Sequence, residues 1–384
     1  MAFSFDELVD RTQTQSVKWH HYAENIVPMW VADMDFRCPE SVVEALHARV
    51  NHGIYGYEGA PRELYAAITE RLRRLYDWRV PEEAIVFLPG VVVGFNVAIR
   101  AWVQPGEAVL IHTPVYPPIL EAGAVMGVET QSAPLTRTVD GRYEIEQDRF
   151  QNAFTAQTRL FLLCNPHNPV GRVFRRDELE ALAESCLQHD VVICSDEIHC
   201  DLVFGGHPHV PIAAIAPEIE ARTVTVMAPS KTFNIPGLHC AFAVIPNPVL
   251  RRRYNQARQG LVGAPNLLGY TAALAGYTQG QPWLDALLVY LEANRDFLME
   301  VLEGSFPELR MVAPEGTYLG WIDCRGAALP GSPYTFFLEK AQVALNDGCT
   351  FGPGGEGFVR LNFGCPRSRL SEALERMRSA LDRR

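Results

Sequence analysis

Residues 159–171 read RLFLLCNPHNPVG and carry the main local indication of the fold. This stretch begins with a continuous apolar run, typical of a strand buried on both faces, and ends in a turn dense in breaker residues. Two later stretches repeat this design: VVICSDEIH at 191–199 and TVTVMAPSK at 223–231. Apolar runs that alternate with helical patterns indicate βα units in a mostly parallel sheet. The predicted fold class is therefore α/β.

The same pattern extends outward in both directions. Strands are expected at 84–88, 108–112, 159–164, 191–195, 223–227 and 240–245, and helices at 39–51, 62–76, 91–102, 176–188 and 248–259. After residue 266 the pattern changes to a long helix at 282–302, followed by strand, helix, strand and helix at 317–324, 334–347, 358–363 and 369–383. A chain of 384 residues is too long for one core. We expect a large domain at 46–280 and a smaller α+β domain made of 1–45 plus 281–384.

Composition excludes several classes of partner. The net charge of −11 offers no basic stripe for nucleic acid, and no apolar run is long enough to span a bilayer. The N-terminus is acidic rather than signal-like, and the nine cysteines contain no CxxC pair, so we expect buried thiols and a cytoplasmic protein. The histidines at 20–21 and 207–209 lack Cys or carboxylate partners at ligand spacing, so no metal site is expected.

Three strand ends carry polar residues that could form one site. Asn168, Asp196 and Lys231 each follow one of the three apolar runs. Taken singly, each has an ordinary explanation, since Asn-Pro is usually a turn, Asp a helix cap and Ser-Lys a surface pair. Ligands of open α/β sheets collect beyond the carboxyl ends of the strands. If the strands are parallel, an amide, a carboxylate and an amine therefore meet at one rim.

Two further strand ends add weaker signals. Gly90 leads from a strand into a helix, and the free N–H groups of Val91 and Val92 would suit a phosphate, although Pro-Gly before a helix is most often only a turn. Tyr116 follows another strand within a proline-rich turn. It could stack on a planar ring, but an ordinary packed tyrosine is an equal alternative.

These five segments, in this order, resemble the fold-type I pyridoxal 5′-phosphate (PLP) enzymes of the class I/II aminotransferase superfamily. NPVG at 168–171 resembles the superfamily's Asn-Pro-Thr-Gly motif, and Ser230-Lys231 resembles its lysine site. The closer likeness is to the cystathionine β-lyase, or cysteine-S-conjugate β-lyase, branch. The motifs that carry it are PMWVADMDF at 28–36, GY at 56–57, SDEIHCD at 195–201, SKTFNIPGL at 230–238 and PEGTYLGW at 314–321.

The resemblance implies the fold-type I architecture, with a mostly parallel seven-stranded sheet, and PLP bound covalently to Lys231, which would also act as the base. It places these further residues at the cofactor: Tyr57, Val91, Val92, Tyr116, Asn168, Asp196, His199 and Ser230. Asp196 would pair with the pyridine nitrogen, Asn168 and His199 would bind the ring oxygen, and Tyr116 would stack on the ring.

The resemblance also implies a shared site and a substrate. Tyr57 would come from a neighbouring subunit, which implies a homodimer with active sites at the interface. Arg360 would bind the α-carboxylate of an amino-acid substrate, since a guanidinium matches a carboxylate with two hydrogen bonds. Asp33 and Tyr116 would also lie near the substrate.

Two departures from the aminotransferase pattern bear on the reaction. Position 239, eight residues after the lysine, usually holds a phosphate-binding Arg and here holds His239, and Ala228 stands where a hydroxyl residue is frequent. These departures favour a C–S β-lyase that cleaves L-cystathionine or a related cysteine S-conjugate to a thiol, pyruvate and ammonia. An aminotransferase on the same scaffold is the alternative, and a non-catalytic PLP-binding regulator is a third interpretation.

Overall fold

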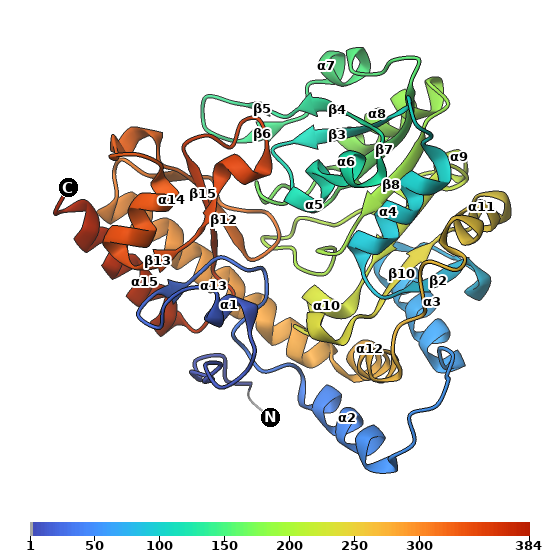
Figure 1. The fold of residues 1–384 in the computed structure, drawn as a ribbon, viewed down its shortest axis with the longest axis horizontal. Helices are drawn as coiled ribbons and strands as arrows, with labels where there is room; N and C mark the ends of the chain where they lie inside the picture. The colour runs from blue at the N-terminus through green and yellow to red at the C-terminus, as the bar shows by residue number, and fades with distance from the viewer. Residues whose placement is uncertain (1–2) are drawn as a thin grey trace.

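The computed structural model describes residues 3–384, and its centre is a seven-stranded sheet (Figure 1). The strands, in spatial order, are Ile85–Leu88 (β2), Ala241–Val244 (β10), Thr223–Met227 (β9), Val192–Asp196 (β8), Thr158–Cys164 (β7), Ala108–Thr113 (β3) and Glu129–Pro134 (β4). All neighbours from β9 to β4 pair in parallel, and β10 alone runs against both of its neighbours. The predicted mostly parallel α/β sheet is confirmed.

Helices cover both faces of this sheet. On one face lie Val91–Trp102 (α4), Pro117–Leu120 (α5), Ala122–Met126 (α6) and Pro248–Arg258 (α11). On the other lie Arg62–Tyr76 (α3), Gln147–Asn152 (α7), Arg176–Gln188 (α8), Pro217–Glu220 (α9) and Leu267–Gln279 (α12). Because side chains alternate along a strand, the side chain of Val86 packs against the helices on the first face of the sheet. The side chain of Phe87 packs against the helices on the second face.

Strand β4, helix α12 and the short helices α5, α6, α7 and α9 were absent from the sequence prediction. Strand β4 is an edge strand whose residues are mostly exposed or half-buried, so it lacks the apolar run that marks its neighbours. Helix α12 is rich in small residues, including Ala272, Ala273 and Gly276, and its hydrophobic residues do not gather on one side. Neither element therefore has the periodicity on which the prediction depends.

The C-terminal part forms a second sheet beside the first (Figure 1). Its strands, in order, are Arg310–Met311 (β11), Leu319–Asp323 (β12), Phe358–Asn362 (β15) and Asn346–Asp347 (β14), all antiparallel. Gln281–Ser305 (α13), Pro333–Phe336 (α14) and Arg367–Leu381 (α15) accompany it. The helix expected at 334–347 is wrong: the helical turns end at Ala341, and Val343–Ala344 (β13) and β14 follow as strands.

The N-terminal segment packs onto this second unit. Val27–Pro28 (β1) pairs in parallel with β13, and Phe5, Val27 and Met29 share a core with helices α13 and α15. Val17–His20 (α1) precedes β1, and Glu40–His52 (α2) packs against α12. Within residues 3–384, no helix combines the length and the apolar character needed to cross a membrane.

Candidate active site

A cavity of about 450 Å³ lies at the carboxyl ends of the main sheet, within the size range of small-ligand sites. It is lined by predicted cofactor residues: Val91, Val92, Tyr116, Asn168, Asp196, His199, Ser230 and Lys231. Strand order explains the gathering. Strands β7, β8 and β9 are parallel neighbours, with Cys164 paired to Asp196 and Asp196 to Val226, so their following turns open at one rim.

Lys231 enters the cavity from Pro229–Thr232 (α10), the single helical turn that follows β9. Its Nζ donates a hydrogen bond to the carbonyl oxygen of Ala32 at 2.5 Å. Burial lowers the pKa of Lys231 to about 8, although the negative charges of Asp33 and Asp196 act in the opposite direction. At pH 7 roughly a tenth of the amine is then unprotonated, far more than at the reference lysine pKa of about 10.4, and this fraction is available as a nucleophile or base.

Asp196 faces the same cavity from the end of β8. Burial raises its pKa to about 7, and the amide of Ile198, which donates to Oδ1 at 3.1 Å, offsets part of the rise. A carboxyl group in this state is stabilised as the carboxylate when a cation is placed against it. Asp196 thus fits the protonated nitrogen of a pyridine ring.

His199 and Tyr116 also line the cavity. Burial lowers the pKa of His199, so its ring is neutral, and its Nδ1 has no hydrogen-bond partner among residues 3–384. The amide of Tyr116 donates to the carbonyl oxygen of Asn168 at 3.0 Å, which joins the turn after β3 to the turn after β7. The cavity therefore combines an aromatic side chain with an unsatisfied imidazole nitrogen.

Arg360 lies beside the cavity rather than in its lining, on β15. Its Nη1 donates to Asn168 Oδ1 at 2.9 Å, and its Nη2 donates to Asn346 Oδ1 at 2.7 Å and to the Trp30 carbonyl at 3.1 Å. Burial lowers its pKa to about 10. Within the described chain these partners are all neutral oxygens, so this buried guanidinium still lacks a carboxylate.

Backbone donors at the start of helix α4 also line the cavity. Helix α4 begins at Val91, and the first amides of a helix have no acceptor within it. Ser230 and His239 are further lining residues, His239 in a left-handed conformation with φ of 49°. These groups could hold a phosphate without the usual arginine.

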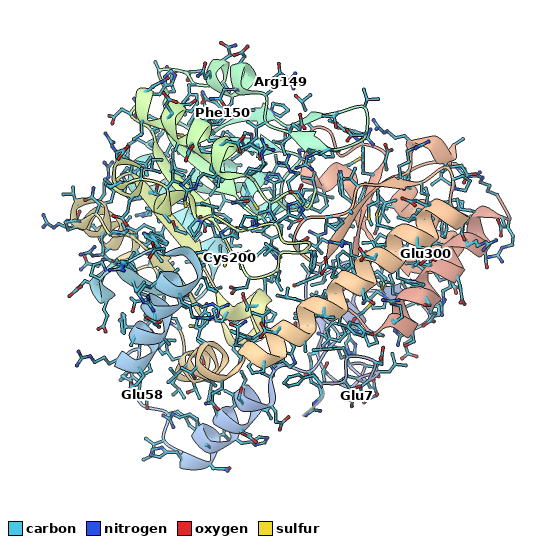
Figure 2. The ribbon with its side chains drawn as sticks, turned by 180° about the vertical axis from the view of Figure 1, so that it is seen from behind. Glu7, Glu58, Arg149, Phe150, Cys200 and Glu300 are labelled. Atoms are coloured by element: carbon cyan, nitrogen blue, oxygen red, sulfur yellow. The ribbon has the colours of Figure 1, made fainter. Side chains whose placement is uncertain are left out.

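Besides Arg360, two further predicted residues lie outside the cavity lining. Tyr57 is fully exposed on the loop between α2 and α3. Its neighbour Glu58 lies at the outer edge of the molecule, whereas Cys200, next to His199, lies near the centre (Figure 2). Asp33 lies on the border of a second cavity of about 560 Å³, and its Oδ2 accepts from Arg11 at 2.6 Å.

The structure also adds residues that sequence reasoning missed. Ile198 lines the cavity from the turn after β8, beyond the end of the strand at Asp196, so strand alternation did not predict its position. Ala32 lines it as well, and Tyr318 donates to the Ala32 carbonyl at 2.8 Å. Tyr318 directly precedes β12, far along the chain from Ala32, so no local pattern predicted this contact.

These groups fit PLP. The cavity offers an amine, a carboxyl group with a raised pKa, an aromatic side chain and free backbone amides, which match the aldehyde, ring nitrogen, ring face and phosphate of that cofactor. Among residues 3–384, no cluster of three His, Cys, Asp or Glu side chains is suited to a metal ion.

Fold and cavity together define a PLP-dependent enzyme of the aminotransferase-like fold, and comparison with known families agrees. The model of the aminotransferase class I and II family matches residues 24–377, so the chain belongs to that family.

Its full-length relatives are more specific. The chain is 39% identical to the cystathionine beta-lyase PatB of Bacillus subtilis, over 98% of this chain and 100% of that protein. The crystal structure of OvoB matches with a TM-score of 0.94 and 44% identity, over 99% of each chain. The PLP-bound C-S lyase of Staphylococcus hominis matches with a TM-score of 0.93 and 33% identity, again over 99% of each chain.

Proposed function

We propose that this protein is a PLP-dependent C–S β-lyase that cleaves L-cystathionine or a related cysteine S-conjugate to a thiol, pyruvate and ammonia. One observation carries the choice of lyase: the chain matches, over its full length, proteins named cystathionine beta-lyase and C-S lyase. His239, in place of the phosphate-binding arginine usual in transaminases, supports the same choice.

In this proposal Lys231 binds the cofactor covalently, and Asp196 accepts a hydrogen bond from the pyridine nitrogen. Asn168 and His199 bind the ring oxygen, and Tyr116 packs on the ring face. The phosphate is held by the amides of Val91 and Val92 and by Ser230. Bound PLP would supply an electron sink for the negative charge that develops at the substrate Cα.

Arg360 binds the substrate α-carboxylate, the anion that its surroundings lack. This contact fixes Cα beside Lys231, whose released amine takes the Cα proton. The Cβ–S bond then breaks, and the electron pair leaves with sulfur as a thiolate that is protonated to the thiol. Water converts the remaining three-carbon unit to pyruvate and ammonia.

The test is to incubate the holoenzyme with L-cystathionine, without any keto acid, and to measure pyruvate and free thiol. Equal amounts of both are expected, and a Lys231→Ala variant should produce neither. Absence of both products from L-cystathionine and from several other cysteine thioethers would refute the lyase proposal.

An aminotransferase is the second candidate, because the matching family model carries that name. It predicts turnover that requires a keto acid in stoichiometric amount, without release of thiol. A non-catalytic PLP-binding protein predicts cofactor absorbance that depends on Lys231 but no turnover of either kind.

We further propose a homodimer in which Tyr57 reaches the neighbouring subunit's cavity. Full exposure of Tyr57 and the place of its neighbour Glu58 at the outer edge of the molecule support this (Figure 2). We also propose the domain division at 46–280 and 1–45 plus 281–384, supported by the core that Phe5, Val27 and Met29 share with α13 and α15.

A cytoplasmic location is proposed as well, and the nine free cysteines support it.

A further inference from the structure

A short strap, residues 30–36, crosses between the two elements that carry Arg360 and Lys231. Arg360 Nη2 donates to the Trp30 carbonyl at 3.1 Å. Two positions along, the Ala32 carbonyl lines the main cavity and accepts from Tyr318 at 2.8 Å. The same Ala32 carbonyl accepts from Lys231 Nζ at 2.5 Å, so the strap contacts both Arg360 and Lys231.

Two asparagines bind the strap, Asn362 from β15 and Asn234 from the turn that follows α10. Asn362, two residues after Arg360 on β15, donates from Nδ2 to the carbonyls of Val31 at 2.6 Å and Asp33 at 2.7 Å.

Asn234, three residues after Lys231, uses both ends of its amide. Its Oδ1 accepts from the Met34 amide at 3.0 Å, and its Nδ2 donates to the carbonyls of Met34 at 2.9 Å and Phe36 at 2.8 Å. The strap is thus the segment that joins the Lys231 turn to the Arg360 strand.

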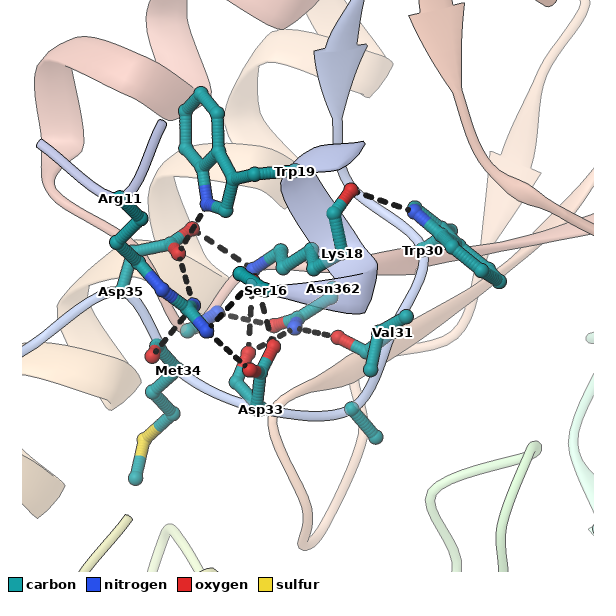
Figure 3. A network of polar contacts seen from close by, with 12 residues as sticks. Arg11, Ser16, Lys18, Trp19, Trp30, Val31, Asp33, Met34, Asp35 and Asn362 are labelled. Atoms are coloured by element: carbon teal, nitrogen blue, oxygen red, sulfur yellow. Dashed lines mark hydrogen bonds and ion pairs between the residues drawn. The ribbon is translucent and has the colours of Figure 1, made fainter. Parts of the chain in front are cut away.

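A charge network also holds the strap (Figure 3). Asp35 accepts from Lys18 Nζ at 2.7 Å, from Arg11 Nη1 at 2.7 Å and from Trp19 Nε1 at 3.0 Å. Arg11 Nη2 also binds Asp33 Oδ2 at 2.6 Å, and Lys18 Nζ donates to the Asp33 carbonyl at 3.1 Å. Two cations thus balance two carboxylates.

The Lys18–Asp35 pair of this network is buried, whereas Arg11 and Asp33 are partly exposed. The side chains of Lys18 and Asp35 are 0% and 5% exposed. Burial raises the pKa of Asp35, but Lys18, Trp19 and Arg11 outweigh it and hold the pKa below its usual value. Removing two charges from water costs much of the free energy that their attraction gains. The main effect of such a buried ion pair is therefore to specify one arrangement of the groups that it joins.

We infer that Asp35 is a positioning residue. With Lys18 and Arg11 it fixes the position of the strap, and the strap in turn fixes the positions of Arg360 and Lys231 relative to each other. The inference rests on the proposed function only for the roles of Arg360 and Lys231. Asp35 itself need not touch substrate, because it acts through the carbonyls of Trp30 and Ala32.

The test is an Asp35→Asn variant of the holoenzyme, titrated with L-alanine and followed by cofactor absorbance. L-Alanine has the α-amino and α-carboxyl groups of the substrate but no leaving group at Cβ, so binding is measured without cleavage. The dissociation constant should rise roughly five- to tenfold, in the range of ordinary coupling between sites. Hydrogen–deuterium exchange should become faster in the peptide that contains residues 30–36.

Glu178→Gln is the matched control, since it also removes a carboxylate from a buried arginine, Arg172, in another part of the chain. It should lower the melting temperature without changing L-alanine affinity or exchange in the strap. Arg11→Gln is a milder second variant, because this side chain is 21% exposed, and it should weaken L-alanine binding in the same direction.

Unchanged L-alanine affinity and unchanged strap exchange in both Asp35→Asn and Arg11→Gln would overturn the inference and leave Asp35 a purely structural residue. The proposed function fails separately. A wild-type holoenzyme that binds L-alanine but releases no pyruvate from thioethers would refute the lyase proposal and leave the positioning result intact.

Discussion

At the scale of single residues, burial shifts Lys231 and Asp196 toward their neutral forms. It lowers the pKa of the amine to about 8 and raises that of the carboxyl group to about 7. The sequence placed both residues at strand ends but contained no information on their pKa values, which depend on how completely distant segments exclude water. The type of a residue is given by the sequence, whereas its exposure to water depends on how distant segments pack around it.

The pKa of Lys231 predicts how cofactor attachment depends on pH. Only the unprotonated amine attacks an aldehyde, so the attachment rate in cofactor-free protein should rise with pH and level off above about 8. A lysine with the reference pKa of about 10.4 would instead show a rate that keeps rising through pH 10. Stopped-flow absorbance after mixing with PLP measures the rate, and continued rise beyond that plateau would contradict the prediction.

Arg360→Lys should impair substrate binding more than cofactor binding. The variant keeps the charge but loses the two-bond fork and leaves Asn168 Oδ1 and Asn346 Oδ1 without their donor. The KM for L-cystathionine should rise about 10- to 100-fold, as expected for a lost charged hydrogen bond of about 1.5–3 kcal/mol. Cofactor absorbance should remain.

Arg376→Lys is the control for this experiment, because Arg376 pairs with Glu372 at the surface helix α15. It should leave KM unchanged. Equal effects of the two substitutions would show that Arg360 has no special part in carboxylate binding.

At the scale of elements, the short helix α10 is positioned by a buried ion pair behind it. Arg71 of α3 binds Asp201 Oδ1 at 2.6 Å, and Thr232 of α10 donates to Asp201 Oδ2 at 2.8 Å. Arg71 also reaches Gln281, the first residue of α13, at 2.9 Å. One carboxylate therefore connects α3 and the Lys231 turn, and its arginine extends the connection to the start of α13.

Arg71→Met should destabilise the protein by about 3–5 kcal/mol, because it leaves the buried Asp201 carboxylate without a counter-charge. Thr232→Val, which removes one hydrogen bond to that carboxylate, should cost about 1–3 kcal/mol. The midpoint of unfolding in urea measures both effects, provided that the slope of the unfolding free energy against urea concentration is unchanged. Arg73→Met, which breaks an exposed pair with Glu70 on the same helix, is the control and should change nothing measurable.

Elements with a clear hydrophobic period were predicted from sequence, and those without one were not. Helix 62–76 coincides with α3, and the strand at 223–227 coincides with β9. Strand β4 was missed because its stability comes from pairing with β3 along a full edge, and pairing leaves no mark in a polar sequence. The helix expected at 334–347 was wrong because its last residues pair with β1 and β15.

At the scale of the whole molecule, the proposed dimer makes a quantitative prediction. Lys231→Ala and Tyr57→Ala chains should each be nearly inactive alone. Mixed by co-refolding, half of the dimers are hybrids, and each hybrid contains one site with both native residues, so about a quarter of wild-type activity should return. No recovery, with hybrid dimers verified by mass spectrometry, would show that Tyr57 does not act across an interface.

The sequence by itself determined the residues at the rim of the sheet. Lys231, Asp196 and Asn168 follow apolar runs, and parallel strands must bring such ends together, so local pattern was sufficient for them. Only the tertiary structure decided the partners of Arg360, the strap held by Asn234 and Asn362, and the buried pairing of Lys18 with Asp35. These contacts join residues far apart in the chain through single side chains. A periodic sequence pattern indicates which face of a helix or strand is buried. It does not indicate which side chain from a distant segment contacts that face.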